Sequence, residues 1–110
     1  DFCSRSHDLP LTPEVCKYQI EIPFMIWMSD TYRRNRPDVA AQVAGALDRP
    51  FSADDLSHLL LDLAGIRCRW YDPARSLIGE RFDTTRPRPL LMGFEPAGNY
   101  ETIIGRDRKQ

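Results

Sequence analysis

Residues 24–28 read Phe-Met-Ile-Trp-Met, an unbroken apolar run that ends abruptly at the polar Ser29. A strand with one face in water alternates apolar and polar residues, so an unbroken run indicates a strand covered on both faces. Pro23 cannot donate a ladder hydrogen bond, which places a strand start or a bulge at that point. We therefore predict a buried core strand over residues 18–28, of the kind found in α/β proteins, with Ser29 able to cap the element that follows.

Two helices are predicted to cover this strand. The first begins at Pro37, which suits the first helical position, and repeats apolar residues at helical spacing as far as Leu47. The second begins after Ser52, a favourable N-cap, and ends at Gly65. Residues 32–36, before the first helix, are too polar for the core. The buried stripe of the second helix is expected to consist of Leu56, Leu59, Leu60 and Leu63.

The remaining segments are predicted to be less regular. Residues 1–17 contain prolines among polar residues and are expected to form a loop, and residues 71–73 mark a turn. Short apolar stretches at residues 90–92 and 99–104 are expected to pair as a β-hairpin with its tight turn at residues 98–99. These elements predict an α/β fold with a buried core strand, two covering helices and a C-terminal β-hairpin.

The chain of 110 residues has the length of one domain, taken as residues 1–110. It opens without an initiator methionine, so we expect this domain to be an incomplete piece of a longer protein. The formal net charge is −1, so no overall field favours nucleic acid and no nucleic-acid partner is expected. No apolar run approaches the roughly 20 residues that a membrane-spanning helix requires.

The three cysteines, Cys3, Cys16 and Cys68, are an odd number and do not form a closed disulfide framework. Cys3 and Cys16 flank a loop that contains proline and can pair in an oxidising compartment. Three free thiols are the alternative, and the spacing leaves both open. The spacing of a zinc ribbon is not present.

Histidine provides the candidate metal or acid–base groups. His7 lies in a polar loop beside Asp8, where a histidine can bind a metal or transfer a proton, although a lone loop histidine is more often solvated. His58 shares one face of the second predicted helix with Asp54 and Asp62, each four residues away. That spacing can hold a metal, but we predict an ordinary solvated row of charges.

Arginines gather in the irregular half of the chain, where Trp70 and Tyr71 lie among them. Such a group can recognise phosphate or carboxylate. The favoured interpretation is surface pairing with Asp72, Glu80 and Asp83. The sequence contains no Walker loop, no dinucleotide-binding glycine pattern and no nucleophile elbow. The arginines are Arg67, Arg69, Arg75, Arg81, Arg86 and Arg88.

Three segments in this order resemble one family. They are IPFMIWMSDTY at residues 22–32, LSHLLLDLAGI at residues 56–66 and YDPARSLIGERF at residues 71–82. Together they resemble the C-terminal part of the sulfatase-like phosphoethanolamine transferases of Gram-negative envelopes, which belong to the alkaline phosphatase superfamily. The resemblance implies a C-terminal portion of an α/β alkaline phosphatase/sulfatase-like catalytic domain, periplasmic and attached to an inner-membrane protein.

The resemblance also implies a chemistry for the parent enzyme. Such enzymes use a zinc site and a threonine nucleophile to move phosphoethanolamine from phosphatidylethanolamine to lipid A or the lipopolysaccharide core. Those groups are expected upstream of this chain, which leaves no catalytic residue within it. His7 matches in position a family histidine that binds substrate phosphate or a second zinc. We expect the chain alone to be inactive.

Two other functions remain open at this point. One is a sulfatase or phosphatase of the same superfamily, in which water is the final acceptor. The other is a non-catalytic interaction module. If the chain stands alone, one side of residues 24–28 is expected to be exposed, exchanged with a partner or covered by residues 90–104, and a homodimer through this strand is a plausible result.

Overall fold

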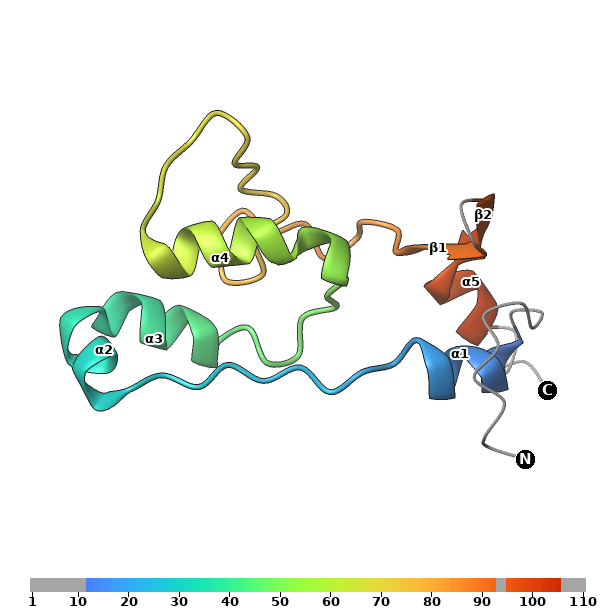
Figure 1. Cartoon of the computed structure of the whole chain (residues 1–110), viewed down its shortest axis with the longest axis horizontal. Coiled ribbons are helices and arrows are strands. Elements are labelled where there is room, and N and C mark those ends of the chain that lie inside the picture. Colours follow the sequence, from blue (N-terminus) through green and yellow to red (C-terminus); the bar gives the residue numbers. More distant parts are fainter. Residues whose placement is uncertain (1–11, 93–94, 106–110) are drawn as a thin grey trace. The chain divides into compact units, whose positions relative to one another are not determined.

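The computed structural model describes residues 12–92 and 95–105, and its chain divides into two compact units (Figure 1). The central unit consists of residues 25–86. The terminal unit combines residues 1–24 with residues 87–110. Among the described residues, no helix is both long and apolar enough to cross a membrane.

The central unit is built from short helices: α2 (Asp30–Asn35), α3 (Pro37–Ala44), the 3₁₀ turn η1 (Ala53–Asp55) and α4 (Leu56–Ala64). Local sequence explains most of their ends. Ser29 caps α2 as predicted, because its hydroxyl oxygen accepts a hydrogen bond from the Tyr32 N–H at 3.1 Å. Pro37 begins α3 and Gly65 ends α4 with a φ of 69°, both as predicted.

The core of the central unit draws on α3, α4 and the irregular segment that follows α4. Val39 of α3 and Leu59 of α4 are buried, and Leu77 and Ile78 join them from the segment at residues 71–86. Figure 1 shows α3 and α4 running alongside one another, which agrees with this shared cluster. Further apolar residues pack around it: Ile26, Tyr32, Val43, Phe51, Leu63 and Phe82.

The predicted core strand over residues 18–28 is wrong. Residues 18–19 lie in or at the end of a helix, and residues 20–29 have no regular secondary structure. Met25 and Trp27 are 87% and 85% exposed, and Ile26 alone of this run packs against the core cluster. No strand is present beside the run in the described part of the central unit, so its backbone has no ladder partner. Of the three outcomes expected for a chain standing alone, the structure shows exposure, at Phe24, Met25 and Trp27, and exchange with a partner stays a prediction.

Four other core assignments are wrong. Leu47 is 83% exposed, Leu60 54% and Leu56 37%, so the apolar faces of the two helices are narrower than predicted. The reason lies in residues 71–86, which pack on the face of α4 that carries Leu59 and leave Leu60 in solvent. Tyr32 was assigned to a stretch too polar for the core, but it packs against the core cluster and its hydroxyl donates to the Leu63 carbonyl at 2.5 Å.

The terminal unit contains α1 (Pro13–Gln19), β1 (Pro89–Met92), β2 (Glu95–Asn99) and α5 (Tyr100–Gly105). The two strands pair antiparallel, with an irregularity in register between Leu90 and Leu91. A hairpin is therefore present, but it is not the predicted one, because its second strand is residues 95–99 instead of 99–104 and its turn is not at residues 98–99. Helices α1 and α5 are in contact.

Two elements of the terminal unit differ from the sequence prediction. Residues 13–17 are helical, although a loop was predicted, and residues 100–104 form α5, although a strand was predicted. Tyr100, Ile103 and Ile104 recur at helical spacing, whereas Tyr100, Thr102 and Ile104 alternate, and such short patterns are ambiguous. The helix buries Ile103, which approaches Gly98. The combination of helices and a small sheet is compatible with the α/β class at a coarse level.

Candidate functional site

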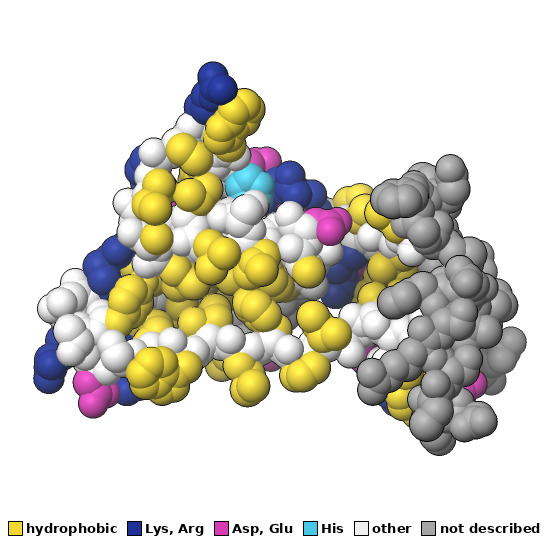
Figure 2. Space-filling view, viewed as in Figure 1, with side chains coloured by type: hydrophobic (Ala, Val, Ile, Leu, Met, Phe, Trp, Pro, Cys, Tyr) yellow, Lys and Arg dark blue, Asp and Glu magenta, His cyan; other side chains and the backbone are white. Residues whose placement is uncertain are grey.

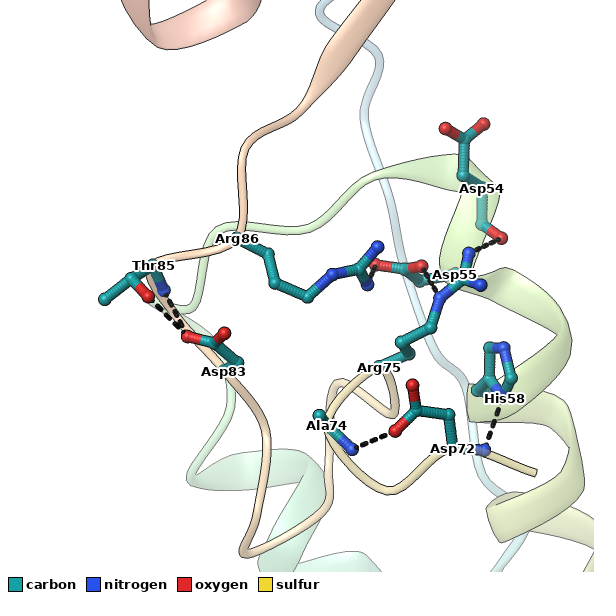
Figure 3. Close-up of polar contacts among 9 residues, drawn as sticks. All are labelled: Asp54, Asp55, His58, Asp72, Ala74, Arg75, Asp83, Thr85 and Arg86. Atoms are coloured by element: carbon teal, nitrogen blue, oxygen red, sulfur yellow. Dashed lines mark hydrogen bonds and ion pairs between the residues drawn. The ribbon is translucent and has the colours of Figure 1, made fainter.

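The densest group of charged side chains in the central unit surrounds Asp55 (Figure 3). Asp55 Oδ1 accepts a hydrogen bond from Arg75 Nε at 2.6 Å, and Oδ2 accepts one from Arg86 Nη1 at 2.8 Å. Arg75 Nη2 also donates to the Asp54 carbonyl at 3.2 Å. We name Asp55, Arg75 and Arg86 the Asp55 cluster. It joins the start of α4 to two points of residues 71–86.

The Asp55 side chain is 9% exposed, yet its carboxylate is held in the charged form. Burial opposes ionisation, but the hydrogen bonds from Arg86 and Arg75 and the charges of both guanidinium groups outweigh it and lower the pKa of Asp55 below its ordinary value of 3.8. Both oxygens of this buried carboxylate are bound by arginines of the same unit. The Asp55 cluster is thus a structural contact within the central unit. We call each side-chain contact that holds residues 71–86 against the rest of this unit a tie.

His58 forms a second tie one turn along α4. Its Nδ1 atom accepts a hydrogen bond from the backbone N–H of Asp72 at 3.0 Å, and the side chain is 7% exposed. An acceptor Nδ1 places the ring proton of the neutral imidazole on Nε2. Asp72 in turn accepts at Oδ1 from the Ala74 N–H at 2.9 Å, which closes the predicted turn at residues 71–73.

Asp62 forms a third tie on the next turn of α4. Its Oδ2 atom accepts from the Tyr71 hydroxyl at 2.9 Å and from the hydroxyl of the fully buried Ser76. Burial and the neighbouring Asp62 carboxylate raise the pKa of Tyr71 above its ordinary value of 10.0, so the phenol remains a donor. Arg67 lies 3.5 Å from the other Asp62 oxygen.

Arg49, just before Pro50, forms a fourth tie from outside α4. Its Nη1 atom donates to the carbonyl oxygens of Leu77 and Gly79 at 2.7 and 2.9 Å. Its guanidinium also lies 5.7 Å from the ring centre of Phe82. Four side chains thus satisfy the backbone or polar groups of a segment that has no regular structure, and this fixes the positions of Leu77 and Ile78 in the core.

The structure does not support the solvated charge row predicted on α4. His58 is buried, Asp62 is mostly buried, and each binds a group of residues 71–86. The backbone carbonyl oxygen of Asp54 accepts a hydrogen bond from Arg75 Nη2. Within residues 12–92 and 95–105, no three His, Cys, Asp or Glu side chains are grouped so that they can hold a metal.

Some of the other predicted site residues lie outside the described part of the chain, and the rest lie within it. His7 and Cys3 lie outside the described residues, and the side chain of Cys16 is also outside them, so the Cys3–Cys16 pairing stays a prediction. Cys68 is a free, exposed thiol. Four of the six arginines form ion pairs within the described residues, but Arg67 pairs with Asp62, Arg75 and Arg86 with Asp55, and Arg88 with Glu101, not with the acids that were predicted.

Arg88 belongs to the terminal unit and has its own partner there. Its Nε atom donates to Glu101 Oε1 at 2.5 Å, and its guanidinium lies 4.3 Å from the ring centre of Tyr100. Burial opposes ionisation of Glu101, but the hydrogen bonds and the charge of Arg88 lower its pKa. This pair links the residue just before β1 to α5 and is likewise a structural contact.

Comparison with known proteins found similar sequences among named transferases. The chain is 35% identical over 71 residues to phosphoethanolamine transferase EptC of Escherichia coli strain K12, a match that covers 64% of this chain and 12% of that protein. It is 34% identical over 83 residues to phosphoethanolamine transferase CptA of Salmonella typhimurium, which covers 74% of this chain and 13% of that protein.

The chain thus spans only a small part of the length of these relatives. No family model matches it, and no solved structure matches it. The similarity to both transferases nevertheless extends over most of the 110 residues and agrees with the resemblance carried by three separate segments. The chain is therefore a phosphoethanolamine transferase-like sequence that corresponds to a short segment of those proteins.

Proposed function

We propose that the chain is the C-terminal portion of the catalytic domain of a phosphoethanolamine transferase and supplies structure there rather than reacting groups. The similarity to two named phosphoethanolamine transferases is the observation that carries this proposal. The four ties of residues 71–86 support the structural role, because each uses polar groups that would otherwise be available to a substrate.

The reaction proposed for the parent enzyme is transfer of phosphoethanolamine from phosphatidylethanolamine to lipid A or the lipopolysaccharide core. The threonine nucleophile and the zinc site belong, in this proposal, to sequence upstream of residue 1, in an alkaline phosphatase-like domain on the periplasmic side of the inner membrane. No zinc-dependent step is assigned to the described residues. His7 is proposed to bind substrate phosphate or a second zinc ion.

The test compares the 110-residue chain with the parent enzyme in one assay. We expect the parent to transfer phosphoethanolamine to lipopolysaccharide and the chain alone to show no turnover. Zinc-dependent cleavage of a phosphodiester by the chain alone would contradict the structural role. Release of phosphoethanolamine to water by the parent, without transfer, would instead assign the hydrolase alternative.

Zinc titration tests the role of His7 without an activity assay. The wild-type chain is expected to bind zinc more tightly than His7→Ala, since the substitution removes an imidazole ligand. Equal binding by the two proteins would remove His7 from the proposal.

Sedimentation of the same samples tests the proposed homodimer through residues 24–28. Trp27→Ala in this exposed run is the informative variant, because it removes the most exposed aromatic side chain of the run.

A further inference from the structure

A projecting loop of the central unit combines basic and apolar side chains. This 66–70 loop has the sequence Ile-Arg-Cys-Arg-Trp, and every residue in it is exposed. Trp70 is 70% exposed and Ile66 is 52% exposed. Figure 2 shows basic and hydrophobic side chains side by side at the tip of the loop that rises from α4 in Figure 1.

Hydrogen bonds hold both ends of the 66–70 loop against α4, so the position of the loop is fixed within the central unit. At its start, the Ile66 N–H donates to the Leu61 carbonyl at 2.9 Å. At its end, Tyr71 and Asp72 are bound to side chains of α4, as described above. The Tyr71 N–H also donates to the Cys68 carbonyl at 3.2 Å, which closes a turn at the tip.

The positive charge of the loop is local. Basic and acidic residues balance over residues 25–86, but residues 63–71 contain two arginines and no acid. The guanidinium of Arg69 lies 4.1 Å from the ring centre of Trp70 and, within the described residues, makes no ion pair. The Arg67 side chain is 77% exposed, and its Asp62 partner already accepts two hydroxyl hydrogen bonds.

We infer that the 66–70 loop docks on a membrane surface that carries anionic phospholipid. Arginine binds phosphate through paired N–H donors, and tryptophan prefers the level of the lipid headgroups. Ile66 can enter the acyl boundary while the arginines stay at the phosphates. The inference is independent of the proposed transferase function, because vesicle binding and group transfer are measured separately.

Vesicle sedimentation of the 110-residue chain tests the inference. We expect binding to vesicles of phosphatidylethanolamine with phosphatidylglycerol, weakening with added salt, and little binding to phosphatidylcholine. The double variant Arg67→Gln/Arg69→Gln is expected to lower partitioning roughly tenfold or more, on the usual gain for basic residues at an anionic surface. In a Trp27→Phe background, the fluorescence of Trp70 is expected to shift to the blue on binding.

Two matched variants separate the loop from other exposed residues. Arg33→Gln/Arg34→Gln removes the same charge from α2, and Trp27→Ala removes an indole that is even more exposed than that of Trp70. Both are expected to keep binding, with circular dichroism confirming that every variant folds. Equal binding to neutral and anionic vesicles, or equal losses in these controls, would overturn the inference. Lipid-free self-association that depends on Trp70 would also overturn it, in favour of a protein contact.

Discussion

Asp55 Oδ2 accepts a hydrogen bond from Arg86 Nη1 at 2.8 Å, which joins two residues that are 31 positions apart in the sequence. The same carboxylate binds Arg75 through its other oxygen. A single buried side chain at the start of α4 therefore holds both an early and a late point of residues 71–86. The stability of the central unit should depend on this carboxylate more than on any exposed ion pair.

Asp55→Asn tests that dependence. The substitution leaves two arginines without their anion, and we expect a loss of about 1–3 kcal/mol in the free energy of unfolding, less than for a fully buried pair because both arginines are about one-third exposed. Urea unfolding followed by tryptophan fluorescence reports on the central unit, which contains both Trp27 and Trp70.

The control for Asp55 is an ion pair of similar length in solvent. Arg33 lies 2.6 Å from Asp30, but both side chains are mostly exposed, so Arg33→Gln should cost no more than about 0.5 kcal/mol. Arg86→Gln should cost clearly less in the Asp55→Asn background than in the wild type, because the pair is already broken. Equal costs in both backgrounds would mean that the Asp55–Arg86 contact contributes nothing.

The lowered pKa of Asp55 predicts a loss of stability in acid. Its folded-state pKa lies below the ordinary value of 3.8, so the unfolded chain takes up the proton at a higher pH than the folded chain. The stabilisation is complete above the unfolded-state value and is lost as the pH falls through the folded-state value. Urea unfolding from about pH 6 downward should show a smaller acid loss in Asp55→Asn than in the wild type. Parallel curves would contradict this.

His58 should stabilise the fold through its acceptor nitrogen. His58→Leu removes the acceptor of the Asp72 N–H, and we expect a loss of about 0.5–1.5 kcal/mol and faster hydrogen exchange of that amide. His58→Asn places an amide oxygen near the position of Nδ1 and should recover part of the loss. Equal exchange rates at Asp72 in the wild type and both variants would show that the hydrogen bond is not formed in solution.

Ser29 and Ser52 both precede helices, and replacing each by alanine tests which of them stabilises its helix as an N-cap. Ser29→Ala removes an acceptor from the Tyr32 N–H and should cost about 1 kcal/mol. Ser52 has the extended backbone of an N-cap but makes no side-chain capping hydrogen bond, so Ser52→Ala should change the free energy of unfolding by less than about 0.5 kcal/mol. Chemical denaturation of both variants decides this, and a larger cost at Ser52 would reverse the assignment.

The serines also show where sequence reasoning succeeds. The cap at Ser29, the start at Pro37 and the end at Gly65 each depend on the chemistry of a few adjacent residues, and all three were predicted. Ser52 has the same local signal, but η1 intervenes before α4 and no capping hydrogen bond forms. Capping residues and helix-terminal Pro and Gly in the sequence thus identify where helices begin and end better than they identify which capping hydrogen bonds form.

What the sequence missed depends on the path of residues 71–86. That segment has no periodic pattern, yet it places Leu77 and Ile78 in the core and pairs Arg75 with Asp55. Burial of His58 has the same origin, since its helical face looked polar until residues 71–86 covered it. The strand predicted at residues 18–28 fails for the converse reason, because an apolar run becomes a strand only where another strand supplies hydrogen bonds.

Gly65 should be the least replaceable glycine of the central unit. Its φ of 69° lies in the left-handed region, and a Cβ atom there would lie 2.9 Å from Arg36 Nη1. Gly65→Ala therefore combines backbone strain with displacement of the Arg36 guanidinium, and we expect a loss of about 1–2 kcal/mol.

Gly45 provides the matched control for Gly65, because it too follows a helix. Its φ is −75°, and an added Cβ would meet the Ala41 carbonyl oxygen at an ordinary 3.5 Å. Gly45→Ala should therefore be neutral or stabilise by up to about 1 kcal/mol, since alanine restricts the unfolded chain. Urea unfolding of the two variants should give changes of opposite sign or clearly different size. If both variants lose the same stability, the left-handed end of α4 is not what distinguishes Gly65.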